Sequence, residues 1–226
     1  MASPQRTAFI DLVLVLATIT AAWALSKWLL YPALGVPDSA PLILRPMTGF
    51  VAAWVLLRWR GQGWDALGLR TPDPWWLMVA GGVALYLVNM ALAKWAVPPL
   101  AQWLHAQPQP FFLGYVRGNA VAFLGWLTIG VVVGGLFEEL LFRGFLLNRV
   151  AELCGGGPAA LAAGIVAQAA IFGLLHWYAG AFGVVYAATF ALANGVFYLV
   201  VRRNLWPLIV VHAVWNSVSI WGIYTR

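Results

Sequence analysis

Residues 119–153 read NAVAFLGWLTIGVVVGGLFEELLFRGFLLNRVAEL. The stretch is apolar from Asn119 to Phe137, and it continues as a helix-compatible segment to about Leu153. About 20 apolar residues suffice for a helix to cross the hydrocarbon core of a bilayer, so the stretch predicts a membrane span. Two acids, Glu138 and Glu139, interrupt it. Because charged side chains are costly inside a bilayer, they mark this span as a candidate functional element.

The composition of the whole chain also indicates a membrane protein. Of its 226 residues, 63% are hydrophobic and 9% are charged, whereas a soluble domain carries about 25% charged residues. This composition excludes a soluble globular domain, and the apolar, aromatic-rich sequence excludes intrinsic disorder. The single cysteine, Cys154, excludes an intramolecular disulfide framework and a cysteine-based metal cluster.

The hydrophobic pattern predicts an all-α, polytopic transmembrane bundle of about seven spans, within a range of six to eight. The predicted spans are residues 8–30, 42–57, 75–97, 119–137 with a helical continuation to 153, 158–178, 182–201 and 205–224. We expect the first span to be uncleaved. We expect one integral-membrane domain over residues 1–226, in which residues 1–118 form more variable N-terminal spans and residues 119–226 form core spans that carry the candidate functional residues.

The basic residues predict topology rather than a nucleic-acid partner. They are spread along the chain, and the longest Lys/Arg run is Arg202-Arg203, so no basic patch for nucleic acid is present. Their bias between alternate loops predicts a cytoplasmic N-terminus and an outside C-terminus. We therefore expect a multi-pass protein of a cell membrane, bacterial or archaeal, whose first partner is the lipid bilayer.

Few polar residues are predicted to lie deep in the spans. Asp11 lies near the start of the first span, from which we expect it to reach the membrane surface. The acids other than Asp11, Glu138 and Glu139 lie in loops or beside turns. The costly residues that remain in the spans are Glu138, Glu139, Arg143, His176, His212 and Asn216.

The two adjacent acids are predicted to have different roles. Glu139 and Arg143 are four residues apart, so on a helix they share a face and can form an ion pair. Glu138 is rotated by about 100° from Glu139, so Arg143 cannot serve both acids equally. Adjacent carboxylates in a low-dielectric medium disfavour double ionisation, which leaves Glu138 suited to accept a proton.

Spacing also predicts which residues meet. Glu138 lies 18 residues before Gly156 and His176 lies 20 residues after it, so a helical hairpin that turns at the glycines brings both to a similar level. His212 and Asn216 are four apart and share a helix face, where they can present two hydrogen-bond donors to one point.

The combination favours hydrolysis. A carboxylate and an imidazole can activate a water molecule, and a histidine with an asparagine can donate to a developing oxyanion. Taken singly, the ion pair, His176 and the His212–Asn216 pair each have a structural explanation as interhelical contacts. Together, on three spans, they favour an active site. Other peptidase types are disfavoured, since no serine occurs between Ser39 and Ser217, no H-E-x-x-H helix is present, and Asp11 is the only aspartate in a predicted span.

Three motifs carry a family resemblance. Glu138-Glu139-Leu140-Leu141-Phe142-Arg143 resembles the E-E-x-x-x-R signature of the CAAX-protease and bacteriocin-processing family of intramembrane endopeptidases. Residues 172–176 resemble its F-x-x-x-H motif, and residues 212–216 resemble its H-x-x-x-N motif. The ordered triple covers about residues 123–216, whereas the first three spans match only in being apolar.

The resemblance implies specific roles. Glu138 looks like the base that acts with His176 on the water, and His212 with Asn216 looks like the oxyanion site. Glu139 and Arg143 look like the supporting pair. The implied substrate is a peptide or a prenylated protein, as in CAAX-box processing.

Two alternatives stay open. Family members are described both as metalloendopeptidases and as metal-independent glutamate proteases, and Zn²⁺ could bind Glu138, His176 and His212. The Asn216 amide and the Arg-paired Glu139 fit oxyanion stabilisation better, so we favour no metal and no cofactor. A non-enzymatic protein, either a bacteriocin-immunity factor or a transporter, could use the same cluster for binding or proton relay. The chain shows no internal repeat of the transporter kind, which favours the enzyme.

Overall fold

The computed structural model describes residues 3–30, 40–71, 74–108 and 112–226, and within these ranges the protein is helical and contains no strand. The α-helices are α1 (Pro4–Leu25), α3 (Ala40–Trp59), α4 (Trp75–Ala91), α5 (Val97–Trp103), α6 (Ala120–Ile129), α7 (Leu147–Leu153), α8 (Gly157–Leu175), α9 (Gly180–Val200) and α10 (Trp206–Tyr224). The predicted all-α polytopic fold is confirmed.

Six helical runs among the described residues are long and apolar enough to cross a membrane. They are Pro4–Leu29, Trp75–Trp103, Ala120–Leu153, Gly157–Leu175, Trp177–Val200 and Trp206–Tyr224. The predicted span at residues 42–57 corresponds to helix α3, which is not one of these six although it contains 20 residues. The number lies within the predicted range of six to eight spans.

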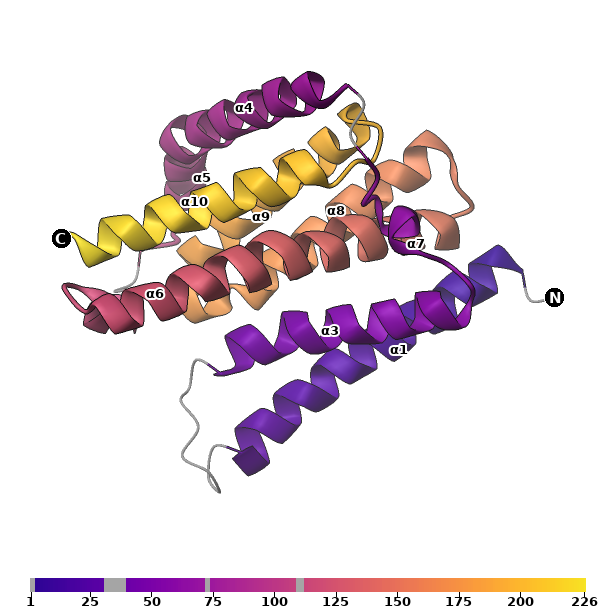
Figure 1. Ribbon diagram of the computed structural model, residues 1–226, viewed down its shortest axis with the longest axis horizontal. Helices are drawn as coiled ribbons and strands as arrows, with labels where there is room; N and C mark the ends of the chain where they lie inside the picture. Colours follow the sequence, from indigo (N-terminus) through magenta and orange to yellow (C-terminus); the bar gives the residue numbers. More distant parts are fainter. Residues whose placement is uncertain (1–2, 31–39, 72–73, 109–111) are drawn as a thin grey trace.

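One long helix occupies the centre of the molecule. It runs without interruption through α6, two π-helical segments and α7, from Ala120 to Leu153. Figure 1 shows it crossing the middle of the view, with α10 on one side and the antiparallel α1–α3 hairpin on the other. Helices α8 and α9 pack against each other behind it, and α4 lies against the outer side of α10.

Local sequence determines where the elements that frame the site begin. Asn119 caps α6, because its side-chain oxygen accepts a hydrogen bond from the Ala122 backbone amide at 3.1 Å. The turn before α8 consists of Gly155, Gly156 and Gly157, which all have positive φ, a conformation that costs glycine little. Pro158 follows at the start of α8, where proline does not remove an intrahelical hydrogen bond. This turn forms the hairpin expected around Gly156.

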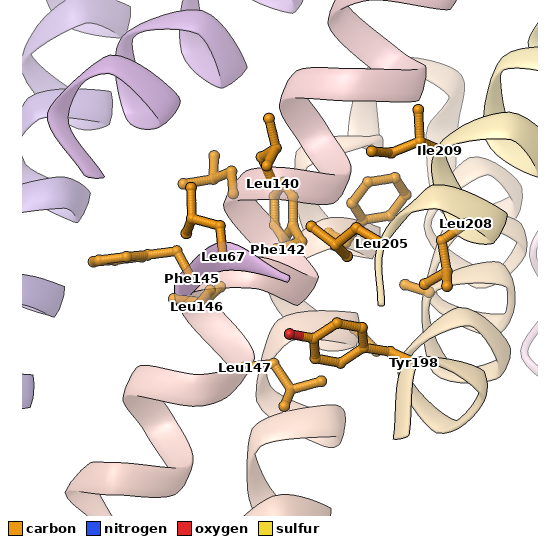
Figure 2. Close-up of a cluster of buried hydrophobic side chains, with 14 of the residues drawn as sticks. Leu67, Leu140, Phe142, Phe145, Leu146, Leu147, Tyr198, Leu205, Leu208 and Ile209 are labelled. Atoms are coloured by element: carbon orange, nitrogen blue, oxygen red, sulfur yellow. The ribbon is translucent and has the colours of Figure 1, made fainter. Parts of the chain in front are cut away.

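A compact apolar cluster fastens the central helix to α9 and α10. Figure 2 shows its side chains, which include Leu147 of the central helix, Tyr198 of α9 and Leu208 of α10. Leu67, from the short helical turn after α3, joins the same cluster. The residues of the three motifs are therefore held on packed elements rather than on loops.

Asp11 lies differently from the prediction. We expected its side chain to reach the membrane surface, but it is fully buried. Its carboxylate bonds Arg60 at 2.5 Å and lies 3.1 Å from Nε of Arg149, while Arg149 also donates to Gln62 at 3.0 Å. The expectation was wrong because these two arginines, distant in sequence, supply the charge and hydrogen bonds that water would otherwise provide.

Candidate active site

Glu138 and Glu139 lie near the middle of the long central helix, where its hydrogen bonding changes. Residues Gly130–Glu138 and Leu140–Leu146 are π-helical, an irregularity that is frequent at functional sites. Sequence periodicity predicted an ordinary helix here. Glu139 and Arg143, four residues apart, form the predicted ion pair despite this irregularity, with Nη1 of Arg143 2.8 Å from Oε1 of Glu139.

Glycines in the π-helical segment allow α10 to approach closely. A Cβ atom on Gly134 would overlap the amide nitrogen of Asn216, and one on Gly135 would lie 2.9 Å from Cβ of Ala213. Small residues serve this purpose between membrane helices. The Gly130 and Gly134 positions thus bring the His212–Asn216 face of α10 against the acidic pair.

Glu139 is the buried centre of a polar network. Its side chain and that of Arg143 are both fully buried. Oε1 of Glu139 accepts hydrogen bonds from Arg143 and from Nδ1 of His212, each at 2.8 Å. The guanidinium carbon of Arg143 also lies 5.0 Å from the ring centre of Phe172, within cation–π range. Glu139 is therefore placed to hold and orient His212 rather than to meet a substrate.

Two asparagines extend this network to distant helices. Nδ2 of Asn194 in α9 lies 3.4 Å from Oε1 of Glu139, and Oδ1 of Asn194 accepts a 3.1 Å hydrogen bond from Asn89 in α4. Asn194 is fully buried and Asn89 is nearly so. The chain Asn89–Asn194–Glu139 therefore links α4 to the centre of the site.

Glu138 approaches the other ring nitrogen of His212 from a different side than Glu139 does, in agreement with the predicted rotation of about 100° between the two acids. Its Oε2 lies 3.8 Å from Nε2 of His212, and its side chain retains some exposure. That separation exceeds an ordinary hydrogen bond of about 2.7–3.2 Å. A small movement or a bridging water would join the two groups. Glu138 is thus the acid of the pair that can reach a substrate.

His176 lies where α8 ends. Nδ1 of His176 is 2.8 Å from the backbone oxygen of Phe172. Because a carbonyl oxygen only accepts, Nδ1 carries the proton of this hydrogen bond, and Nε2 of the neutral ring is an acceptor. His176 can therefore accept a proton from water at Nε2.

One N–H group of His212 and one of Asn216 already donate to other protein atoms, so the two side chains have fewer available donors than their spacing alone suggests. Since Nδ1 of His212 donates to the carboxylate of Glu139, Nε2 bears a proton only when the ring is an imidazolium. Nδ2 of Asn216 donates one proton to the Gly130 backbone oxygen at 2.9 Å, and its second N–H is available for another acceptor. With a proton on both ring nitrogens of His212, the pair could donate two N–H groups to an oxyanion.

The four residues predicted to react with or bind the substrate line one cavity. Glu138, His176, His212 and Asn216 all line a cavity of about 170 Å³. We call this the reaction chamber. It collects side chains from the central helix, from the end of α8 and from α10, so the three motifs meet in space.

The described side chains that could bind zinc are not grouped as a metal site in this structure. Among the described residues, no three His, Cys, Asp or Glu side chains form a group that could hold a metal ion. Nδ1 of His176 and Nδ1 of His212 are each engaged by a protein oxygen, an arrangement that also accompanies histidine metal ligands, so these two bonds do not discriminate between the metal-dependent and metal-independent alternatives.

Sequence reasoning missed three residues of this region. Asn89 and Asn194 lie inside predicted spans, and counting buried amides along with the acids and histidines would have found them. Tyr178 also lines the reaction chamber, with its ring centre 5.5 Å from that of His176. Nothing in the sequence distinguishes this tyrosine from the many interfacial aromatic residues.

Comparison with known families gives one match. Residues 120–218 match the model of the family described as type II CAAX prenyl endopeptidase Rce1-like. Comparisons with curated proteins and with solved structures gave no match. The family match, which covers the C-terminal part of the chain, confirms the resemblance that the three motifs carry.

Proposed function

Because residues 120–218 are similar to type II CAAX prenyl endopeptidases, we propose that this protein hydrolyses a peptide bond of a membrane-associated substrate without a metal ion. One observation carries the proposal. A carboxylate, two imidazoles and an amide from three separate motifs line one chamber beside a buried carboxylate–guanidinium pair.

The proposed reaction begins with water held between Glu138 and Nε2 of His176. Glu138 removes a proton as the water oxygen bonds the scissile carbonyl carbon. His212 as imidazolium and the second N–H of Asn216 donate to the resulting oxyanion. The C–N bond then breaks as Glu138 returns the proton to the leaving amine, which gives a carboxylic acid and an amine, and the acid proton then passes to the amine to leave a carboxylate and an ammonium group.

Glu139 and Arg143 act through His212 in this proposal. The Glu139 carboxylate fixes the imidazole orientation by its 2.8 Å bond to Nδ1. Arg143 neutralises Glu139, which would otherwise be a buried, uncompensated charge. The substrate we propose is a protein C-terminus of the CAAX kind, with or without an isoprenoid.

The decisive experiment compares wild type with Glu138→Gln. Both full-length proteins are reconstituted in liposomes and given two fluorogenic CAAX peptides that differ only in an isoprenoid on the cysteine. Removing the base should lower kcat by about 10²–10⁴-fold. Asp65→Asn, which changes an exposed acid outside the three motifs, should cleave as wild type does.

Equal cleavage by Glu138→Gln and wild type would overturn the assignment of the base. The non-enzymatic alternative makes a different prediction. An immunity factor or transporter would cleave neither peptide in any variant, yet Glu138→Gln would still change binding or proton movement across the liposome membrane.

A further inference from the structure

A groove lies between α4 and α10, outside the reaction chamber, and no described residue lines both cavities. Figure 1 shows α4 lying along the outer side of α10. The groove has a volume of about 490 Å³, within the range of about 300–1,000 Å³ typical of ligand pockets. Its described lining comes from these two helices and consists of Trp75, Met78, Val79, Gly82, Val83, Tyr86, Leu87, Trp206, Pro207, Val210, Val211 and Val214.

The α4–α10 groove has the polarity and the length of a lipid acyl chain. Its described lining contains no charged side chain, and Val83 and Val210 are each more than half exposed. The α4 wall from Trp75 to Leu87 extends about 18 Å at the helical rise of about 1.5 Å per residue. One leaflet accounts for about half of a hydrocarbon core that is about 30 Å thick. The groove can therefore hold an acyl chain over the depth of one leaflet.

The two segments that precede these helices are tied together at one end of the groove. Helix α4 begins at Trp75 and α10 begins at Trp206, and both residues line the groove. Before them, Nη2 of Arg70 donates to the backbone oxygen of Arg202 at 2.9 Å, and Nδ2 of Asn204 donates to the backbone oxygen of Arg70 at 3.1 Å. These bonds place Arg70 beside the turn that enters α10.

This end of the groove is basic. Arg70, Arg202 and Arg203 are all exposed, and the positive ends of the α4 and α10 dipoles add to their charge. Of the two acids in the segment between α3 and α4, Asp65 is exposed and lies five residues before Arg70, and Asp73 lies outside the described residues. The arginines therefore form a site of positive charge at the end of an apolar groove.

The backbone at Arg202 and Arg203 is held in an unusual conformation. Both residues have positive φ, 54° and 60°, which is uncommon for residues other than glycine. The Arg203 amide donates to the Tyr198 backbone oxygen at 2.7 Å, and Arg70 holds the turn from the other side. Strained residues of this kind persist where their surroundings fix them, and they are frequent at ligand-binding sites.

We propose that an anionic phospholipid binds at this place, with its phosphate at Arg202 and Arg203 and one acyl chain in the α4–α10 groove. Guanidinium groups match phosphate oxygens in geometry and charge, and exposed tryptophans such as Trp75 and Trp206 are typical of the membrane interface. The topology predicted from the basic residues places this end on the cytoplasmic side, where anionic lipids concentrate. The site goes beyond the proposed peptidase function and does not depend on it.

The test measures lipid binding to the purified full-length protein by native mass spectrometry in detergent. Dioleoyl-phosphatidylglycerol is the anionic probe, and dioleoyl-phosphatidylcholine is the zwitterionic probe with the same chains. Arg202→Gln/Arg203→Gln should weaken binding of phosphatidylglycerol by about 10–30-fold and leave phosphatidylcholine unaffected. The matched control Arg6→Gln/Arg58→Gln removes two exposed arginines of the same predicted membrane side and should bind as wild type does.

A second pair of variants tests the groove itself. Val210→Trp fills it and should weaken binding of phosphatidylglycerol by about tenfold, equivalent to about two buried methylenes. Val121→Trp makes the same change at an exposed position of α6 and should have no effect. Because a bound lipid stabilises the folded state, phosphatidylglycerol should also raise the midpoint of thermal unfolding of wild type and both controls, but less that of the two site variants.

Four results would overturn the inference. The first is equal binding of the two lipids, and the second is binding that neither site variant alters. The third is displacement of the lipid by inorganic phosphate combined with normal binding to Val210→Trp, which would show an anion site without a role for the groove. The fourth is a dimer of wild type that carries no lipid and is lost in Val210→Trp, which would make the groove a contact between two copies of the chain.

Discussion

Among the residues that the structure describes, two buried carboxylates are held by arginines, Asp11 and Glu139, and they differ in their surroundings. Both side chains are fully buried. Asp11 bonds Arg60 and lies 3.1 Å from Nε of Arg149, so it joins α1 to the end of α3 and to α7. Glu139 bonds Arg143 and His212, and the next acid in the chain, Glu138, lines the reaction chamber.

The difference teaches how to separate a structural ion pair from a catalytic one. Both carboxylates are buried and both have an arginine partner, so neither of these two features by itself indicates a catalytic role. The Glu139 centre is distinguished by a second titratable group beside it that lines a cavity together with two histidines. We therefore assign Asp11 to helix assembly and the Glu139 centre to positioning of the reacting groups.

The largest effect is expected for Arg143→Leu. It leaves Glu139 charged and buried without its main partner, which costs about 3–5 kcal/mol of unfolding free energy, and it should depress activity as well. Detergent-denaturation curves and the peptide assay measure the two effects. The double variant Glu139→Leu/Arg143→Leu should recover much of the stability but not the activity. Arg58→Leu, at an exposed position of α3, serves as the control.

Asp11→Asn should affect stability alone. Its arginine partners retain partial solvent exposure, so they can recover some hydration. The unfolding free energy should therefore decrease by about 1.5–3 kcal/mol, the range for hydrogen bonds to charged groups. Activity per folded molecule should equal that of wild type. If Asp11→Asn instead abolished activity while the protein stayed folded, the distinction between the two centres would be wrong.

Asn194→Leu tests whether the amide chain positions Glu139. We expect a loss of about 1 kcal/mol in stability, since single polar contacts between membrane helices are worth about 0.6–1.7 kcal/mol. The loss of kcat should be roughly fivefold, equivalent to about 1 kcal/mol. Asn89→Leu breaks the same chain one step further from Glu139 and should lower kcat less. Equal kcat values for wild type and both variants would assign the asparagines to packing only.

The smallest effect is expected from metal removal. Incubation of the reconstituted protein with a strong chelator should leave kcat unchanged, because the chamber residues do not group as metal ligands. A zinc peptidase treated in parallel provides the positive control. Loss of activity that returns on adding Zn²⁺ would replace the metal-independent proposal with a zinc mechanism.

Sequence reasoning predicted the features that depend on local spacing. The long apolar runs predicted the membrane-type helices, and the four-residue spacing predicted the Glu139–Arg143 pair. The glycine turn predicted a hairpin, and the structure places Glu138 and His176 of that hairpin on one chamber. Each of these predictions depends on residues of one helix or of two consecutive helices.

The remaining features depend on partners distant in the sequence. Arg60 and Arg149 keep Asp11 buried, and no pattern around Asp11 indicates either partner. Asn194 reaches Glu139 from 55 residues away, and the engaged proton of His212 depends on a carboxylate 73 residues away. Periodicity can show that such polar groups need a partner, but only the packing of the helices determines which partner they find.

The length of the central helix links the protein to the thickness of its membrane. Its 34 residues would extend about 50 Å at the ordinary helical rise, whereas a hydrocarbon core is about 30 Å thick. Tilting or protrusion from the bilayer must absorb this excess. Because Glu138 lies near the middle of this helix, its distance from the lipid headgroups changes with that adjustment. Lipid acyl-chain length should therefore influence which part of a substrate reaches the reaction chamber.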